Sequence, residues 1–490
     1  MVFKMNQSAL AQIVFLGIAM GLSRSAQAQT SLSAGVKMTA NEVTPIAWRH
    51  FRATPHSKPR SDLEQSRQLL QNAVRYNLGW MKATYPGAAA GIAPITVRPG
   101  SEEAVIRPPA SAVLAVATAL KCGAYDEKMM GVSREEAISR TVGLINALCT
   151  VHIPNLSGAG GTPGYSLRRW GSSWQSALWT TFIGQAGWML WDDLDASARV
   201  QLANVVSTEA DRFIAPGYKV IYWKTVAGKE NFAGDTKAEE NAWNAMEVQL
   251  ACAMMPRHPH AAAWRRICSE LMISAFANQQ DALSNEQIID GKPVKDWLHG
   301  FNLREDGGVV NHGIVHPDYM TAVVFNLRSF LVQSLARQQV SQTASFNAPI
   351  IYATLVNHQW PSPPFLGPGG TIYQPGKVEL YYPQKTDWSR YRFDIYYLMD
   401  LNADAFGLDK DLPHKAREWF PLRAQRLQEM QARHPDGHLY DPGEFDTYQG
   451  REQLAAWQFS DAYLLLWLKA QGKLSLEANW LAPTSAPKAR

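Results

Sequence analysis

The amino-acid sequence predicts an all-α protein, an (α/α)6 toroid of helical hairpins with minor β pieces. Apolar residues recur at spacings of three and four along most of the chain, as they do on the buried face of a helix. No strand pattern is comparably strong. The helices pair at intervals of about 40 residues without the fixed period of a solenoid. Such a toroid leaves a central funnel, lined by the loops that precede the inner helices.

Twelve stretches carry the helical period. The first places Leu70, Val74 and Leu78 on one face, Ser133 and Asp195 are suitable N-cap residues for two others, and several stretches end at Gly or Pro. In chain order, the predicted helices span residues 62–85, 109–121, 134–151, 174–191, 196–213, 238–255, 260–276, 317–338, 347–358, 389–401, 412–432 and 451–471. Short β pieces are expected at residues 219–223 and 371–382.

The start of the chain has the three parts of a secretory signal peptide. These are the positive charge of Lys4, an apolar run over residues 13–22, and the small-x-small motif Ala26-Gln27-Ala28. We expect residues 1–28 to be removed, and the protein to be periplasmic or extracellular. Residues 29–60 are expected to form an extended arm, residues 61–475 a single toroid catalytic domain, and residues 476–490 a C-terminal tail.

Composition narrows the class of ligand. A net charge of +4 with 18% charged residues argues against a protein that binds nucleic acid by neutralising phosphates. The 17 Trp and 17 Tyr residues suit stacking on sugars, although large helical cores also use them. The 4 cysteines match no metal-binding spacing, and both buried free thiols and two disulfides are compatible with them.

Residues 306–320 hold the densest group of reactive side chains: Asn311, His312, His316 and Tyr319. A loop rich in turn formers separates them, so His312 and Tyr319 can converge on one cleft. β-Elimination of a uronic acid needs a base for the proton next to the carboxyl group and an acid for the departing oxygen. His and Tyr can fill these roles. The alternative is a loop that only caps the next helix.

Two further groups are candidates for binding substrate. Arg168, Trp170 and Trp174 lie just before a predicted helix, where an arginine can clamp a carboxylate and the rings can stack on a sugar. The alternative is a solvated turn. Asp387 and Arg390 lie in a cluster of cations and aromatic residues near the C-terminus, and such clusters are usually solvated faces.

The helix predicted from residue 238 starts with a polar cluster. Asp235 or Thr236 is expected to cap it, with Glu239 in a capping box. Capping leaves four residues of the first turns unexplained: Glu240, Asn241, Trp243 and Asn244. Of these, Asn241 is the first candidate for a neutral amide that binds a substrate carboxyl group, and Asn244 is the second.

With these motifs the chain resembles the helical-toroid polysaccharide lyases, which include the chondroitin, hyaluronate and xanthan lyases and, more distantly, the heparinase and alginate lyase families. Asp306-Gly307 precedes His312, Tyr319 follows it by seven residues, and Asn241-Ala-Trp243 is similar to the Asn-Trp helix start of those enzymes. The spacing of His and Tyr departs from the chondroitin-type pattern, which leaves His316 as a second candidate imidazole. The β-rich C-terminal half of those enzymes is also missing.

The resemblance implies a secreted lyase that cleaves a uronic-acid-containing polysaccharide or oligosaccharide. Asn241 would neutralise the uronate carboxyl group, His312 or His316 would abstract the proton, and Tyr319 would protonate the leaving oxygen. Arg304 and Arg168 would hold flanking carboxylates. The scheme needs no cofactor and no metal ion, and the expected partner is the acidic carbohydrate, without nucleic acid or membrane.

Two alternatives remain open. A glycoside hydrolase on the same toroid would use two carboxylates, Glu240 and Asp306, with Asp387 in reserve. A non-catalytic carbohydrate-binding protein would have an aromatic funnel without an aligned acid and base. Elimination creates a conjugated double bond that absorbs ultraviolet light and hydrolysis does not, so product absorbance distinguishes the two reactions.

Overall fold

The computed structural model describes residues 42–51, 61–98, 100–155, 169–445 and 448–481. Their secondary structure is mostly helical, which confirms the all-α prediction. By their contacts, the described residues belong to one compact unit. The predicted signal peptide lies outside the described residues, and so does most of the predicted N-terminal arm.

Each predicted helical stretch overlaps an observed helix, although several boundaries differ by a few residues. In chain order these helices are α2 (Ser61–Thr84), α3 (Glu102–Lys121), α5 (Arg134–Thr150), α6 (Ser176–Met189), α7 (Ala196–Arg212), α8 (Ala238–Met254), α9 (Ala261–Ala275), α11 (Val323–Ala336), α12 (Ala348–Val356), α13 (Phe393–Phe406), α14 (Phe420–Ala432) and α15 (Arg451–Ala470). Two shorter helices, α4 (Glu127–Met130) and α10 (Pro317–Met320), complete the α-helices of the described residues. The stretch predicted at 317–338 is therefore two helices rather than one.

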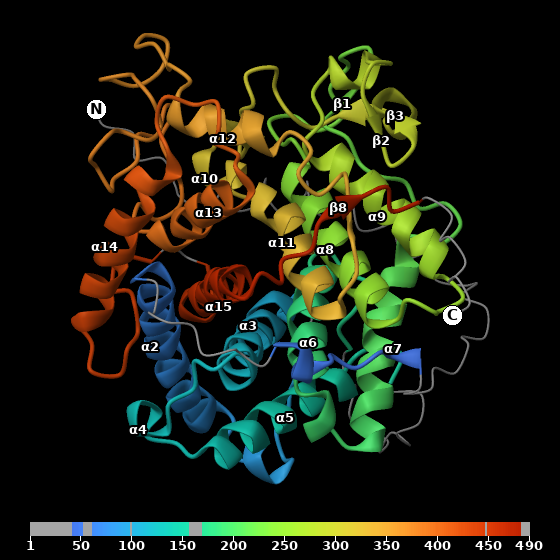
Figure 1. Cartoon of the computed structure of the whole chain (residues 1–490), viewed down its shortest axis with the longest axis vertical. Coiled ribbons are helices and arrows are strands. Elements are labelled where there is room, and N and C mark those ends of the chain that lie inside the picture. Colours follow the sequence, from blue (N-terminus) through green and yellow to red (C-terminus); the bar gives the residue numbers. More distant parts are fainter. Residues whose placement is uncertain (1–41, 52–60, 99, 156–168, 446–447, 482–490) are drawn as a thin grey trace, which may run out of the picture. The chain divides into compact units, whose positions relative to one another are not determined.

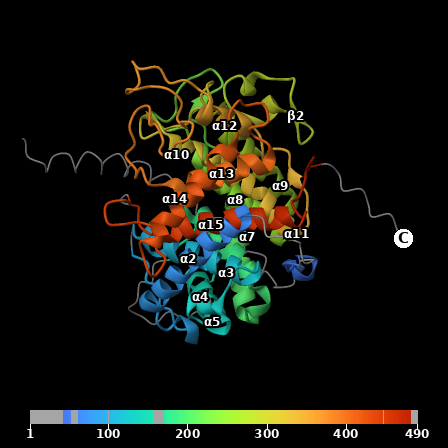
Figure 2. The same ribbon diagram turned by 60° about the vertical axis from the view of Figure 1, so that its left-hand side comes forward.

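Alternate helices pack against each other in a closed series. Helix α3 contacts α6, α6 contacts α8, α8 contacts α11, α11 contacts α13, α13 contacts α15, and α15 contacts α3. Helices α2, α5, α7, α9 and α14 flank members of this series. Figures 1 and 2 show α15 between α2, α3 and α13, so the last helix lies beside the first two long ones.

The helices of the closed series are the most buried. Every residue of α6 is buried, and in α8 only Glu239 and Glu240 are not. Helix α3 is the one helix of the described residues that is long and apolar enough, by length and composition, to cross a membrane. Most of it is buried in the protein, where it contacts α2, α5, α6 and α15. The four cysteines are free thiols, all buried.

The predicted caps hold for two helices and fail for a third. Ser133 accepts a hydrogen bond from the Glu136 amide at the start of α5, and Asp195 accepts one from Ala198 at the start of α7. The prediction that Asp235 or Thr236 caps α8 is wrong. Lys237 occupies the N-cap position with a left-handed φ of 50° and no side chain caps the helix, while Asp235 accepts a hydrogen bond from the Lys237 amide, one residue before it. Glu239 makes no capping box there.

In the part of the chain that the structure describes, strands occur only as pairs of two-residue segments. β1 (Lys224–Thr225) pairs with β4 (Gly300–Phe301), β2 (Ile288–Ile289) with β3 (Lys292–Pro293), β5 (Val310–Asn311) with β6 (Ile314–Val315), all antiparallel, and β7 (Val340–Ser341) runs parallel to β8 (Glu477–Ala478). The β pieces predicted at 219–223 and 371–382 are not strands. In the second segment, one isolated bridge joins Tyr373 to Leu380, since turns rich in Pro and Gly interrupt any ladder.

Candidate functional site

The β5–β6 hairpin places His312 at its tip. His312 and Gly313 form the two-residue turn, with φ values of 53° and 78°, the positive backbone angles that tight hairpins need. The Gly313 amide donates to the Gly234 carbonyl, and the Thr236 amide donates to Val310. The hairpin is therefore fixed to the loop that leads into α8, and the His312 side chain is left exposed.

Helix α10 follows the hairpin directly and carries the second imidazole and the phenol. His316 is the N-cap residue of α10, Pro317 occupies its first turn, and Tyr319 is one residue before its end. Both functional side chains are buried. The Tyr319 hydroxyl lies 3.5 Å from His312 Nε2, and its ring lies edge-on to His316 at 4.8 Å. The structure thus brings His312, His316 and Tyr319 together, as predicted.

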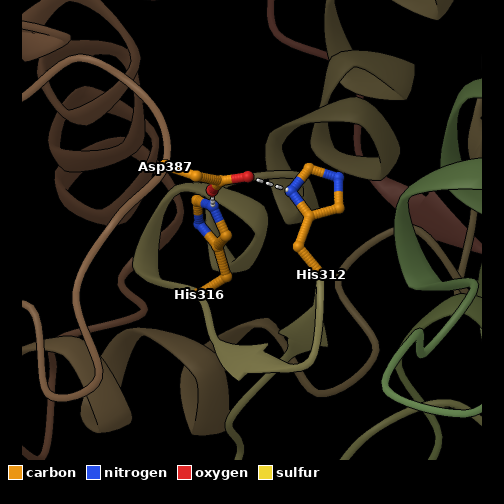
Figure 3. Close-up of side chains that lie close together, drawn as sticks. All are labelled: His312, His316 and Asp387. Carbon is orange, nitrogen blue, oxygen red and sulfur yellow. Dashed lines mark hydrogen bonds and ion pairs between the residues drawn. The ribbon is translucent and has the colours of Figure 1, made fainter. Parts of the chain in front are cut away.

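Asp387 joins the two imidazoles from a distant part of the chain. Figure 3 shows its carboxylate between the two rings, with one oxygen 2.6 Å from His312 Nδ1 and the other 3.1 Å from His316 Nε2. Burial raises the pKa of Asp387, but the hydrogen bond from His316 and the charge of His312 outweigh this and leave it lowered. The carboxylate expected to hold substrate is the centre of the cluster.

A second carboxylate lies behind His316. Asp318 is buried, with one oxygen 3.4 Å from His316 Nδ1. Its other oxygen accepts a hydrogen bond from the Tyr396 hydroxyl at 3.0 Å. Burial lowers the pKa of His316, and the charges of Asp318 and Asp387 oppose this shift. His316 therefore lies between two carboxylates, one on each ring nitrogen.

The cluster also has the composition of a metal site. Among the described residues, His312, His316 and Asp387 each offer a ligand atom, and these atoms lie within 4.8 Å of one another.

Burial raises the pKa of the Tyr319 phenol, and the negative charge of Glu239 raises it further, so the hydroxyl stays protonated. The cluster thus combines a protonated phenol, two imidazoles and an ionised carboxylate.

A narrow cavity of about 40 Å³ lies beside the cluster. Residues of α6, α8, α11, α13 and α15 line it, together with Trp388, Arg392 and Tyr448. Trp388 also borders two wider, more open pockets of about 570 and 290 Å³. The Trp388 ring packs 4.8 Å from that of Tyr319, and the Arg392 guanidinium lies 4.0 Å from its centre. Trp388 therefore lies between the narrow cavity and the two open pockets, and Asp387 borders the larger of these.

Glu239 lines this cavity, although the sequence did not predict it as a site residue. Burial raises its pKa to about 8, and the neighbouring charge of Glu240 adds to the shift. The sequence reading assigned Glu239 to a capping box, a role that the structure does not give it. Trp388 and Arg392 were missed too, although they lie in the aromatic and basic cluster that suggested Asp387. One feature of the sequence could have indicated Glu239: it stands next to Glu240 at the start of an otherwise apolar helix.

Several predicted site residues lie in the protein interior instead. Asn241 is fully buried, and its amide donates to the Ile221 carbonyl at 2.9 Å and to Ser274 Oγ at 3.0 Å. The prediction that it opens into the cleft beside His312 is therefore wrong. Trp170, Trp243 and Asn244 are also buried, and Trp170 donates to the Leu148 carbonyl. These three side chains serve packing rather than an open sugar-binding surface.

The remaining predicted residues are mostly engaged locally. Trp174 is 58% exposed and packs edge-on against Trp243. Glu240 pairs with Lys237 at 2.8 Å, and the Asn311 side chain accepts a hydrogen bond from the His312 amide. Arg304 binds both oxygens of Asp306, which holds the turn before the hairpin. Arg390 lies 5.6 Å from the Tyr382 ring, and Arg168 lies outside the described residues.

Comparison with protein-family models, curated proteins and solved structures gives no significant match. The function is therefore inferred from the geometry of the site.

Proposed function

We propose that this protein is a polysaccharide lyase that cleaves a uronic-acid-containing polysaccharide or oligosaccharide by β-elimination. The observation that carries the proposal is the alignment of Asp387, His312 and Tyr319. Asp387 accepts a hydrogen bond from Nδ1 of His312, and Nε2 of the same ring lies 3.5 Å from the Tyr319 hydroxyl. A base and an acid thus lie side by side at the edge of open pockets.

The roles follow from the tautomer of His312. With the ring proton on Nδ1, facing Asp387, the lone pair is on Nε2, beside the Tyr319 hydroxyl, and takes the proton next to the uronate carboxyl group. The electrons form the double bond, and the bond to the glycosidic oxygen breaks. Tyr319 donates its proton to that oxygen as it leaves. His316 is then a positioning residue, because its Nε2 holds the other oxygen of Asp387.

The uronate carboxyl group needs a partner other than Asn241, which is buried. Arg392 lines the cavity beside Trp388 and lies within electrostatic reach of both Tyr319 and Glu239. A guanidinium has five donors in a planar fork, which suits a carboxylate. We assign the neutralisation of the substrate charge to Arg392, assisted by the protonated form of Glu239.

The toroid belongs to the same proposal. The closed series α3, α6, α8, α11, α13 and α15 would be the inner ring, and the alternating helices α2, α5, α7, α9, α12 and α14 the outer one. The cavity beside Trp388 supports this assignment, because residues from five helices of the series line it. In this reading, the catalytic cluster lies at one end of the ring axis. Export by the predicted signal peptide would bring the enzyme to extracellular or periplasmic polymers.

One observation favours a glycoside hydrolase as a second candidate. Glu239 has a pKa raised to about 8, whereas that of Asp387 is lowered, and such a split between two carboxyls is typical of a general acid and its partner. The pair first expected, Glu240 and Asp306, is less suitable, because Lys237 and Arg304 already hold these carboxylates.

A screen over uronate-containing polymers tests the proposal. Each polymer is incubated with the protein, and both ultraviolet absorbance and new reducing ends are measured. A lyase produces the two signals together, whereas a hydrolase produces reducing ends alone. Reducing ends without absorbance, lost in Glu239→Gln and kept in Tyr319→Phe, would replace the lyase by the hydrolase.

A further inference from the structure

We propose that His312, His316 and Asp387 form a binding site for a divalent transition-metal ion of the zinc class. Two imidazoles and a carboxylate are ligands that such ions accept, and three protein ligands leave positions for water or a substrate oxygen. The donor atoms already lie within 4.8 Å of one another (Figure 3). The inference goes beyond the proposed lyase activity, since it concerns binding of the ion itself.

The three ligands differ in how freely their side chains can move, and this difference allows a metal ion to enter the site. His316 is fully buried and cannot turn away, whereas the side chains of His312 and Asp387 are 44% and 51% exposed. His312 also stands at the tip of a hairpin. An ion can therefore reach the site from solvent, bind the fixed imidazole, and gather the two exposed ligands with small side-chain movements.

The residues behind His316 provide an independent observation. Asp318 faces the other ring nitrogen at 3.4 Å and is itself held by the Tyr396 hydroxyl. A buried carboxylate on the far nitrogen of a ligating histidine fixes the ring tautomer and makes the near nitrogen a better ligand. In the metal-free protein, His316 Nε2 donates to Asp387. When Nε2 binds the ion instead, the ring proton moves to Nδ1, which has no hydrogen-bond partner and faces Asp318.

Metal binding and base catalysis exclude each other at His312. In the metal-free form the single ring proton lies on Nδ1, against Asp387. When the Nδ1 lone pair binds the ion, that proton moves to Nε2, and Asp387 becomes a ligand of the ion. Nε2 can then no longer accept a proton from substrate. On the proposed lyase function, the ion would therefore inhibit turnover, and a chelator would restore it.

Direct titration tests the site without any substrate. Full-length protein freed of metal with a chelator is titrated with Co²⁺, followed by visible absorption, and with Zn²⁺, followed by calorimetry. We expect one ion per chain. Loss of a group that only orients a ligand costs roughly 10–100-fold in affinity, and Asp318→Asn should lose that amount. His312→Ala and Asp387→Asn each remove a ligand and should lose more.

His414→Ala is the matched control. His414 is an exposed histidine with a carboxylate of Glu418 2.9 Å from its Nδ1, and it belongs to no three-residue ligand group among the described residues. It should bind the ions like the wild type. Equal affinity of the wild type, His312→Ala and Asp387→Asn would overturn the metal site. Tight binding that leaves turnover unchanged would instead overturn the role of His312 as the base and leave the site standing.

Discussion

At the scale of single residues, the position of one proton decides what the cluster can do. Asp387 holds Nδ1 of His312, so the opposite nitrogen faces Tyr319 and the pockets beyond. Without the carboxylate, either tautomer would be available and the ring could rotate at the hairpin tip. The same side chain binds His316, so a single loop residue orders both imidazoles.

Replacing the phenol tests this arrangement. Tyr319→Phe keeps the ring that packs against His316 and Trp388 but removes the proton donor. We expect turnover to fall by about 10²–10⁴-fold, the usual value of a positioned acid, with substrate binding retained. Steady-state kinetics and an equilibrium binding measurement on the same polymer separate the two effects. Tyr125→Phe is the control, because its hydroxyl donates to the Val132 and Ser133 carbonyls and lies outside the cluster. Full activity of Tyr319→Phe would exclude Tyr319 as the acid.

The residues of the hairpin and α10 were predictable because they lie close together in the sequence. Asp387 is 75 residues from His312, so its place between the imidazoles is set by the fold. The sequence predicted Asn241 for the site and Glu239 for the helix cap, whereas Glu239 is the one that lines the cavity. This error also comes from contacts that only the fold determines. Both lie in the first turn of α8, and only the position of α9 decides which one is covered, since Asn241 donates to Ser274 of α9.

At the scale of elements, the periodic spacing of apolar residues predicted the position of every long helix but not the residue at which each helix begins and ends. One helix was predicted to begin at Pro109, whereas α3 begins at Glu102 and contains both Pro108 and Pro109. Residues 106–120 of this helix are all buried. Packing along that length offsets the roughly 3 kcal/mol that a proline costs inside a helix. Tertiary contacts of this kind cannot be seen in a local pattern.

One buried carboxylate, that of Glu209 in α7, binds this helix to α6 and to the segment before it. Glu209 accepts hydrogen bonds from the Ser172 amide, from Ser176 Oγ and from His152 Nε2, and Arg212 lies 3.5 Å away. Burial alone would raise the pKa of Glu209, but these partners outweigh it and lower the pKa to about 2. The charged form is therefore the one that the fold stabilises.

This lowered pKa predicts a pH dependence of stability. A carboxyl group with a lower pKa in the folded state stabilises the fold above its unfolded pKa, and the contribution is lost as pH falls toward the folded value. Glu209→Gln should therefore destabilise the protein by about 3 kcal/mol at neutral pH. The difference from the wild type should shrink between about pH 4.5 and about pH 2.

Urea unfolding of both proteins across this pH range measures the difference. Glu64→Gln is the control, because Glu64 forms a partly exposed pair with Arg67, which is expected to contribute at most about 1 kcal/mol. A difference between wild type and Glu209→Gln that stayed constant down to low pH would show that the Glu209 charge does not stabilise the fold.

At the scale of the whole molecule, contacts between the ends of the sequence hold the helices together. Helix α15 packs on α2 and α3, and the Tyr463 hydroxyl donates to the Cys122 carbonyl across 341 residues of sequence. On its other side, α15 is joined to α11 by the buried pair of Arg328 and Asp461, at 2.7 Å. Arg328 also donates to Gln185 of α6, so one side chain connects three helices of the closed series.

These connections predict that residues 61–475 unfold as a unit. Arg328→Met leaves the Asp461 charge buried without its cation, which should cost about 3–5 kcal/mol. Because α6, α11 and α15 depend on the same side chain, helical circular dichroism and tryptophan fluorescence should shift together, with coincident transitions. Arg328→Met combined with Asp461→Leu removes both charges and should recover much of the lost stability. If the two probes separated in the wild type, or if only one moved in Arg328→Met, the helices would belong to more than one cooperative unit, and the closed series of contacts would not govern folding.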